Sequence, residues 1–120
     1  MLKKSVQDTP AFVAGDQTLI REVLHPKNET INLPYSLAYA TLAPGQSSEA
    51  HILRTSSEVY VFVRGSAQVF VNEETTQVKP GDVIHIPEGA RQHVRNDGNE
   101  TLEFWCIVAP AWSAEDELVM

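Results

Sequence analysis

The sequence predicts an all-β fold in which two sheets form a sandwich or barrel. Short segments of alternating apolar and polar residues recur along the chain, a pattern typical of strands with one buried face. Glycine, proline, asparagine and aspartate separate these segments, and they supply the backbone angles of tight turns. A length of 120 residues suits one compact domain with one core.

Ten strands are expected, and turn residues separate them. Gly15-Asp16 lies between the first two, Pro44-Gly45 follows the third, and Pro80-Gly81 precedes the eighth. So many short strands must curl into a closed or two-layered structure to cover their edges. The expected strands are 11–14, 18–24, 35–43, 50–54, 58–64, 66–71, 75–78, 82–86, 91–95 and 101–108.

One domain is expected over residues 1–120. Its barrel core is predicted at about 35–108, with N-terminal strands within 11–24 and a short tail at 110–120. In the tail, Ser113-Ala114-Glu115-Asp116 resembles a capping box, which predicts either one short helical turn or a frayed end.

The charge balance and the absence of special segments exclude several classes of protein. Sixteen acidic and nine basic residues give a net charge of −7, which disfavours nucleic-acid binding. No apolar run approaches the roughly 20 residues that span a bilayer, and the N-terminus lacks the apolar stretch of a signal peptide. A lone Cys106 cannot form an internal disulfide. A cytoplasmic protein without membrane partners is therefore expected.

The segment from Gly45 to Gly65 carries the strongest functional signal. Glu58 begins the run EVYVFV, which is apolar on both alternating faces, and such strands are usually central and covered on both sides. A carboxylate at that position needs a metal, a cation or hydrogen-bond donors. With His51 close by in the sequence, the functional site is expected here.

Two patterns of glycine, histidine and acidic or amide residues extend over residues 45–96. The first comprises Gly45, the segment His51-Ile52-Leu53, Glu58 and Gly65. The second comprises Gly81, the segment Pro87-Glu88-Gly89, Gln92 and Asn96. With these motifs and the flanking strands, most of the chain resembles the cupin family of small β-barrels. The resemblance implies a double-stranded β-helix, or jelly-roll barrel.

The resemblance also implies a candidate metal site. In metal-dependent cupins, three histidines and one glutamate bind a divalent ion. His51 and Glu58 match two of these positions, whereas Leu53 and Gln92 stand where the other histidines are expected. The implied ligands are His51, Glu58 and Gln92, and the implied ion is Fe, Mn, Ni, Cu or Zn.

Strand alternation predicts which side chains face the barrel interior. His51 and Leu53 share one face, and Gln92 is expected inward. His93, flanked by two arginines, is expected on the solvent side and is the less favoured ligand, whereas the direction of His85 stays open. The residues predicted to line the pocket are Leu53, Tyr60, Phe62, His85, Phe104 and Cys106.

Each candidate residue has a structural alternative. His51 is a metal ligand or a general acid–base group, or a histidine that is simply hydrogen-bonded at the rim of the barrel. Glu58 is a ligand or base, or a buried carboxyl that Tyr60, Gln92 or backbone donors hold, with its pKa raised by desolvation. Gln92 is a cation ligand or the donor that satisfies Glu58.

These observations predict a small cupin with a divalent-metal-type pocket, acting as an oxygenase or isomerase of a small polar molecule. The alternative is a metal-free cupin that binds a small ligand or a sugar derivative without catalysis. A homodimer is also expected, because the apolar outer face of Val59, Val61 and Val63 needs cover. Residues 11–24 are the candidates for strand exchange within such a dimer.

Overall fold

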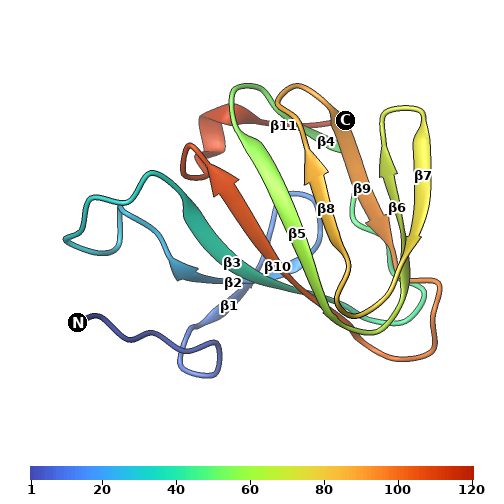
Figure 1. Ribbon diagram of the computed structural model, residues 1–120, viewed down its shortest axis with the longest axis horizontal. Coiled ribbons are helices and arrows are strands. Elements are labelled where there is room, and N and C mark those ends of the chain that lie inside the picture. Colours follow the sequence, from blue (N-terminus) through green and yellow to red (C-terminus); the bar gives the residue numbers. More distant parts are fainter.

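The computed structural model describes residues 1–120 and consists of two antiparallel sheets that face each other (Figure 1). All ten predicted strands form, each within one residue of its predicted bounds. The strands are β1 Ala11–Val13, β2 Leu19–Leu24, β3 Ser36–Leu42, β4 His51–Leu53, β5 Ser57–Arg64, β6 Ala67–Val71, β7 Glu74–Val78, β8 Val83–Ile86, β9 Arg91–Arg95, β10 Leu102–Ala109 and β11 Glu117–Val119.

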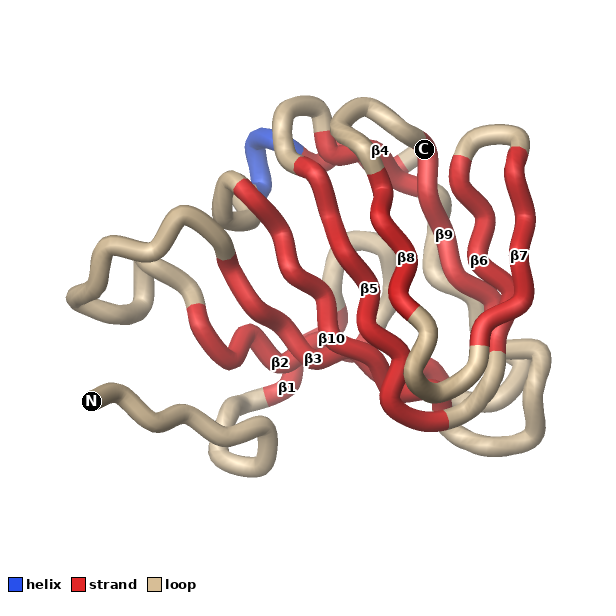
Figure 2. Tube along the Cα trace, viewed as in Figure 1, coloured by secondary structure: helices blue, strands red, loops and turns tan.

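The strand order confirms the predicted jelly-roll barrel. One sheet has the order β1-β2-β3-β10-β5-β8, and the other has the order β11-β4-β9-β6-β7. Strands that are distant in sequence lie side by side, such as β3 with β10 and β4 with β9 (Figure 2). Because β5 and β4 belong to different sheets, Glu58 and His51 approach the interior from opposite sides.

The C-terminal tail forms the short helical turn, one of the two predicted alternatives, and then continues as a strand that was not predicted. Ala114–Asp116 form a 3₁₀ turn, but Ser113 makes no side-chain cap. The chain then adds β11 to the edge of β4, with Leu53 opposite Glu117 and His51 opposite Val119. Asp116 accepts hydrogen bonds from the Thr55 and Ser56 backbone amides. The end of the tail is therefore a strand of the second sheet. No helix in the structure is long and apolar enough to cross a membrane.

The hydrophobic core lies between the two sheets and follows the predicted alternation. Tyr60, Phe62 and Phe104 pack together, with ring centroids 5.1–6.1 Å apart, in the offset and edge arrangements that aromatic rings favour. The core cluster comprises Ala40, Leu42, Tyr60, Phe62, Ala67, Val69, Val78, Ile86, Ala90, Val94, Leu102, Phe104 and Cys106.

Gly65 joins β5 to β6 and cannot carry a side chain. Its φ is +85°, and a Cβ would lie 3.0 Å from the Thr101 carbonyl oxygen and 3.1 Å from Leu102 Cα. Both the left-handed backbone and the close approach of the neighbouring chain require glycine. This turn takes the chain from β5, the strand that carries Glu58 and Tyr60, to β6 in the other sheet.

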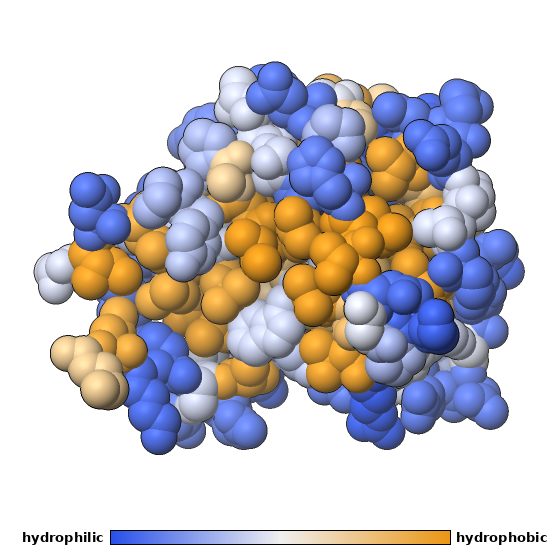
Figure 3. All heavy atoms as spheres, viewed as in Figure 1, coloured by the Kyte–Doolittle hydropathy of each residue, from blue (hydrophilic) through white to orange (hydrophobic).

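The outer face of the six-stranded sheet is unusually apolar. Figure 3 shows apolar side chains gathered over β10, β5 and β8. Val63 and Val83 are 46% and 58% exposed, and Val61 lies opposite Val83 across the β5–β8 pair. In this structure β2 pairs with β3 of its own chain, and β1 pairs with β2.

Candidate functional site

A cavity of about 170 Å³ opens between the sheets, lined by residues of the β1–β2 loop and of the C-terminal segment. Thirteen of its 22 lining residues are hydrophobic, so the few polar groups decide what it can do chemically. The loop between β1 and β2 contributes Asp16 to the lining, β4 contributes His51, and β5 contributes Glu58. The C-terminal segment contributes Trp112 and Glu117.

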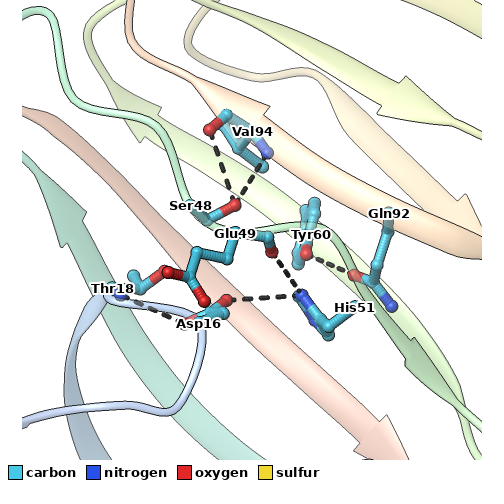
Figure 4. Close-up of polar contacts among 8 residues, drawn as sticks. All are labelled: Asp16, Thr18, Ser48, Glu49, His51, Tyr60, Gln92 and Val94. Atoms are coloured by element: carbon cyan, nitrogen blue, oxygen red, sulfur yellow. Dashed lines mark hydrogen bonds and ion pairs between the residues drawn. The ribbon is translucent and has the colours of Figure 1, made fainter. Parts of the chain in front are cut away.

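Glu58 is buried close to a hydrogen-bonded pair of side chains. Gln92 and Cys106 both act on its carboxyl, and the Tyr60 hydroxyl donates to Gln92 Oε1 (Figure 4). Gln92 and Glu58 are 1% and 7% exposed. Burial first, and then the charge of Asp16, raises the pKa of the Glu58 carboxyl from its usual 4.5 to about 8. At neutral pH this group is therefore mainly a protonated carboxylic acid.

Cys106 lies beside Glu58 as a protonated thiol and is not a nucleophile. Burial, followed by the charge of Glu58, raises the pKa of the Cys106 thiol well above 9.0. A thiol with a raised pKa carries little thiolate, which is the reactive form. Burial and the Glu58 charge likewise raise the pKa of Tyr60 well above 10.0, so its hydroxyl stays a donor.

His51 is oriented by contacts on one side of its ring. Its Nδ1 lies 3.1 Å from the Glu49 carbonyl oxygen and 3.6 Å from Asp16 Oδ2 (Figure 4). A carbonyl oxygen only accepts, so Nδ1 carries the proton and the lone pair of the neutral ring is on Nε2. Nε2 has no partner within the protein, yet no fully buried side-chain nitrogen or oxygen is unpaired. Nε2 is therefore open to the cavity.

Asp16 was not predicted as a site residue. The sequence showed only the Gly15-Asp16 turn, but its Oδ1 accepts from the Thr18 amide at 3.0 Å and its carbonyl accepts from the Glu49 amide at 2.7 Å. These bonds fix the β1–β2 loop against the segment before β4. Only this tertiary contact places the carboxylate beside His51, and no local pattern signals it.

The C-terminal contribution was not predicted either. His25 Nε2 donates to the Trp112 carbonyl at 2.7 Å, and the Trp112 amide donates to Ser36 Oγ at 2.9 Å. The His25 Nδ1 atom accepts from the Lys27 amide, which fixes this tautomer. His25 therefore holds in place the segment that leads to Glu117. Its position before Pro26 in the sequence indicates only a turn residue.

The residues present do not fit a resident divalent metal. Leu53 offers no donor atom, and Gln92 does not line the cavity while its Oε1 already accepts from Tyr60. No group of three His, Cys, Asp or Glu side chains is placed to hold an ion. The implied set of His51, Glu58 and Gln92 thus reduces to one imidazole and one carboxyl, fewer ligands than a stable transition-metal site uses.

The predicted lining residues divide into three groups. Leu53, Tyr60, Phe104 and Cys106 line the cavity. Phe62 does not: it is an inward residue, but it lies in the core beyond the cavity. His85 was wrongly placed in the lining, because it is exposed and lies opposite Val59, whose side chain is on the outer face.

His93 lies outside, as the alternation predicts. Its ring stacks on Phe70, with centroids 4.2 Å apart and planes within 5°. Burial, followed by the charge of Arg91, lowers the pKa of His93.

The structure is a jelly-roll of two facing sheets, with a partly apolar cavity that His51 and Glu58 line. The cupin domain model matches residues 38–108, and the chain belongs to the cupin family. An uncharacterized protein of Methanocaldococcus jannaschii is 31% identical over all of this chain and 95% of its own length.

Two further similarities differ in coverage. The mannose-1-phosphate guanylyltransferase ManC of Salmonella typhimurium is 27% identical over 98% of this chain, which spans only 25% of that relative. The structure of Pac13, a nucleoside dehydratase from Streptomyces, has a TM-score of 0.80 at 20% identity, covering 100% of this chain and 91% of that one. The latter similarity is one of fold.

Proposed function

We propose that this protein is a metal-free acid–base enzyme that transfers protons on a small molecule bound in the barrel. The observation that carries the proposal is His51, which is 3% exposed, held through Nδ1, and open to the cavity at Nε2. A base whose far nitrogen is held by a carbonyl and a carboxylate is oriented to accept a proton at the other nitrogen.

Glu58 supplies the complementary acid. With its pKa near 8, it carries a proton that it can donate, while His51 carries a lone pair that can receive one. In such a pair, His51 Nε2 removes a proton from a carbon beside a carbonyl, and Glu58 protonates the carbonyl oxygen or a departing hydroxyl. In the first case the product of this step is an enol, which becomes an isomer when His51 returns its proton to carbon and an enol hydroxyl returns its proton to Glu58. In the second case the C–O bond of a hydroxyl on the next carbon breaks, and the products are an alkene plus water.

The comparisons support this class of chemistry. Pac13 shares the fold and is a nucleoside dehydratase, of which a variant has been solved with uridine, so a barrel of this fold can host the elimination of water. The mannose-1-phosphate guanylyltransferases align with this chain over a part of their length. A hydroxylated small molecule is therefore the substrate class to test first.

The test combines binding with exchange of substrate protons. Protein treated with a chelator is screened by thermal shift against small hydroxylated carbonyl compounds, and stabilising compounds are followed by proton NMR in D₂O. We expect exchange or conversion without metal, and a loss of roughly 100-fold or more in His51→Gln. His85→Gln, at an exposed position, should behave as wild type.

Two outcomes contradict the proposal. Activity that the chelator removes and one divalent ion restores would indicate the metal-dependent oxygenase or isomerase instead. Stabilisation by ligand without any exchange or conversion would indicate a binding protein for a small ligand or sugar derivative.

We also propose that two copies pair through the outer face of the six-stranded sheet. The exposed apolar face over β10, β5 and β8 can cover itself across a two-fold axis, and a second copy presents the same flat antiparallel surface. Charged Arg64, at the end of β5, lies at the edge of this face beside Glu103 at 3.2 Å, consistent with a polar rim.

Light scattering at micromolar concentration tests the dimer. We expect twice the chain mass of 13.3 kDa for the wild type and the single chain mass for Val83→Glu, because that substitution introduces a charge into the apolar face. Thr76→Glu, at an exposed position of the other sheet, should remain dimeric. A monomeric wild type would refute this arrangement.

A further inference from the structure

We propose that the ligand of this cavity is an organic amine with an apolar body, and that phosphorylated or carboxylated molecules are excluded. The inference rests on the proposed small-molecule site and adds the charge of its ligand. The site itself stands on the enclosed cavity and on the buried, open Nε2 of His51. The carboxyl groups around it then decide which ligand charge it takes.

The ionisable lining is almost entirely acidic. Asp16, Glu22, Glu58 and Glu117 line the cavity, and no lysine or arginine does. The only basic group is His51, and its Nδ1 already faces Asp16 at 3.6 Å. Glu58 is mainly protonated at neutral pH, so a phosphate in this cavity would meet the carboxyl groups of Asp16, Glu22 and Glu117 without a cation to balance its charge, in surroundings that screen charge poorly.

The arginines that could balance these charges are engaged elsewhere. Arg21 donates to the Val6 and Thr9 carbonyl oxygens. Arg54 donates to the Glu115 carbonyl oxygen on the outside of the tail. Neither guanidinium lines the cavity, so the negative lining has no internal counter-ion beyond His51.

Glu117 has no partner that explains its position. Its side chain is half-buried, and its carboxyl accepts no hydrogen bond and forms no salt bridge, unlike that of Asp16, which accepts from the Thr18 amide. It approaches the β1–β2 loop closely, since a Cβ on Gly15 would lie 3.2 Å from its Oε2. The charges of Asp16 and Glu117 both act on Glu58, which places the three carboxyl groups around one space.

The aromatic lining suits the same ligand. Phe12, Tyr60, Phe104 and Trp112 line the cavity, and aromatic faces attract cations as well as apolar groups. A ligand with an ammonium group and an apolar body would satisfy the unpartnered Glu117 carboxylate and fill the apolar space. A neutral alcohol of the same shape would satisfy only the second requirement.

Three probes of one shape and different charge test the inference: phenethylamine, phenethyl alcohol and hydrocinnamate. Calorimetry at neutral pH and low salt should show phenethylamine binding about tenfold or more tightly than phenethyl alcohol, which corresponds to about 1.4 kcal/mol. Hydrocinnamate should not bind measurably. Added salt should weaken amine binding and leave alcohol binding unchanged.

Variants identify the responsible charge. Glu117→Gln should lower the affinity for phenethylamine about fivefold and leave that for phenethyl alcohol unchanged. The matched control is Glu115→Gln, at an exposed position of the same tail, which should change neither.

Equal affinities for the amine and the alcohol, or amine binding unaffected by Glu117→Gln, would overturn the inference while leaving the acid–base proposal intact. Tight hydrocinnamate binding, or no binding of the amine, would also overturn it. The acid–base proposal fails separately, when a bound compound shows no exchange of its protons.

Discussion

Replacing Asn96 by alanine is expected to destabilise the fold by about 3 to 4 kcal/mol. Its side chain is fully buried and makes three hydrogen bonds with backbone groups. Nδ2 donates to the Leu42 carbonyl at 3.0 Å and to the Glu100 carbonyl at 2.9 Å, while Oδ1 accepts from the Gly98 amide at 3.0 Å. Alanine leaves all three partners without these bonds.

Urea unfolding of three variants measures this effect. Asn96→Asp retains the acceptor for Gly98 but loses both donors and adds a buried charge. Its loss of unfolding free energy should therefore lie at least between those of Asn99→Ala and Asn96→Ala, and the charge can make it larger. Asn99→Ala, at an exposed position three residues on, should stay within about 0.5 kcal/mol of wild type. An Asn96→Ala protein as stable as Asn99→Ala would show that the barrel closes without this side chain.

The motif that contains Asn96 illustrates why so much of the fold could be predicted. Strand alternation and turn residues are local signals, and a buried strand must satisfy them wherever it lies in the barrel. The same rule correctly placed Gln92 inward and His93 outward. In the structure the Gln92 amide oxygen accepts from the Tyr60 hydroxyl, and the predicted role of Gln92 as the donor that satisfies Glu58 stays a prediction.

The remaining features depend on tertiary contacts that have no local signal. Alternation gives the face of a side chain but not its depth, so Phe62 was expected at the cavity and instead lies in the core. His85 needed the register of β8 against β5 to place it outside. Asp16 and Glu117 come from the two ends of the chain and reach the cavity only because β1, β2 and β11 add to the sheet edges.

Glu58 gives the second large prediction, a fall in stability as the pH rises from about 4.5 to about 8. The folded protein keeps the carboxyl proton up to about pH 8, whereas the unfolded chain releases it near 4.5. The folded state therefore binds more protons in this window, and linkage lowers its stability with increasing pH. The contribution is fully present below pH 4.5 and is lost by about pH 8, a change of up to roughly 5 kcal/mol.

The substitution Glu58→Gln isolates this contribution, because it removes the titration and keeps the size of the side chain. His93, with its lowered pKa, contributes with the opposite sign in both proteins, so the difference between their curves reports Glu58 alone. Unfolding by urea at several pH values should show that the unfolding free energy of the variant increases relative to that of the wild type as pH rises. Glu88→Gln, at an exposed turn, should follow the wild type throughout. Parallel curves for wild type and Glu58→Gln would mean that the carboxyl is ionised in the folded state, and Glu58 could then not serve as the proton donor of the proposed reaction.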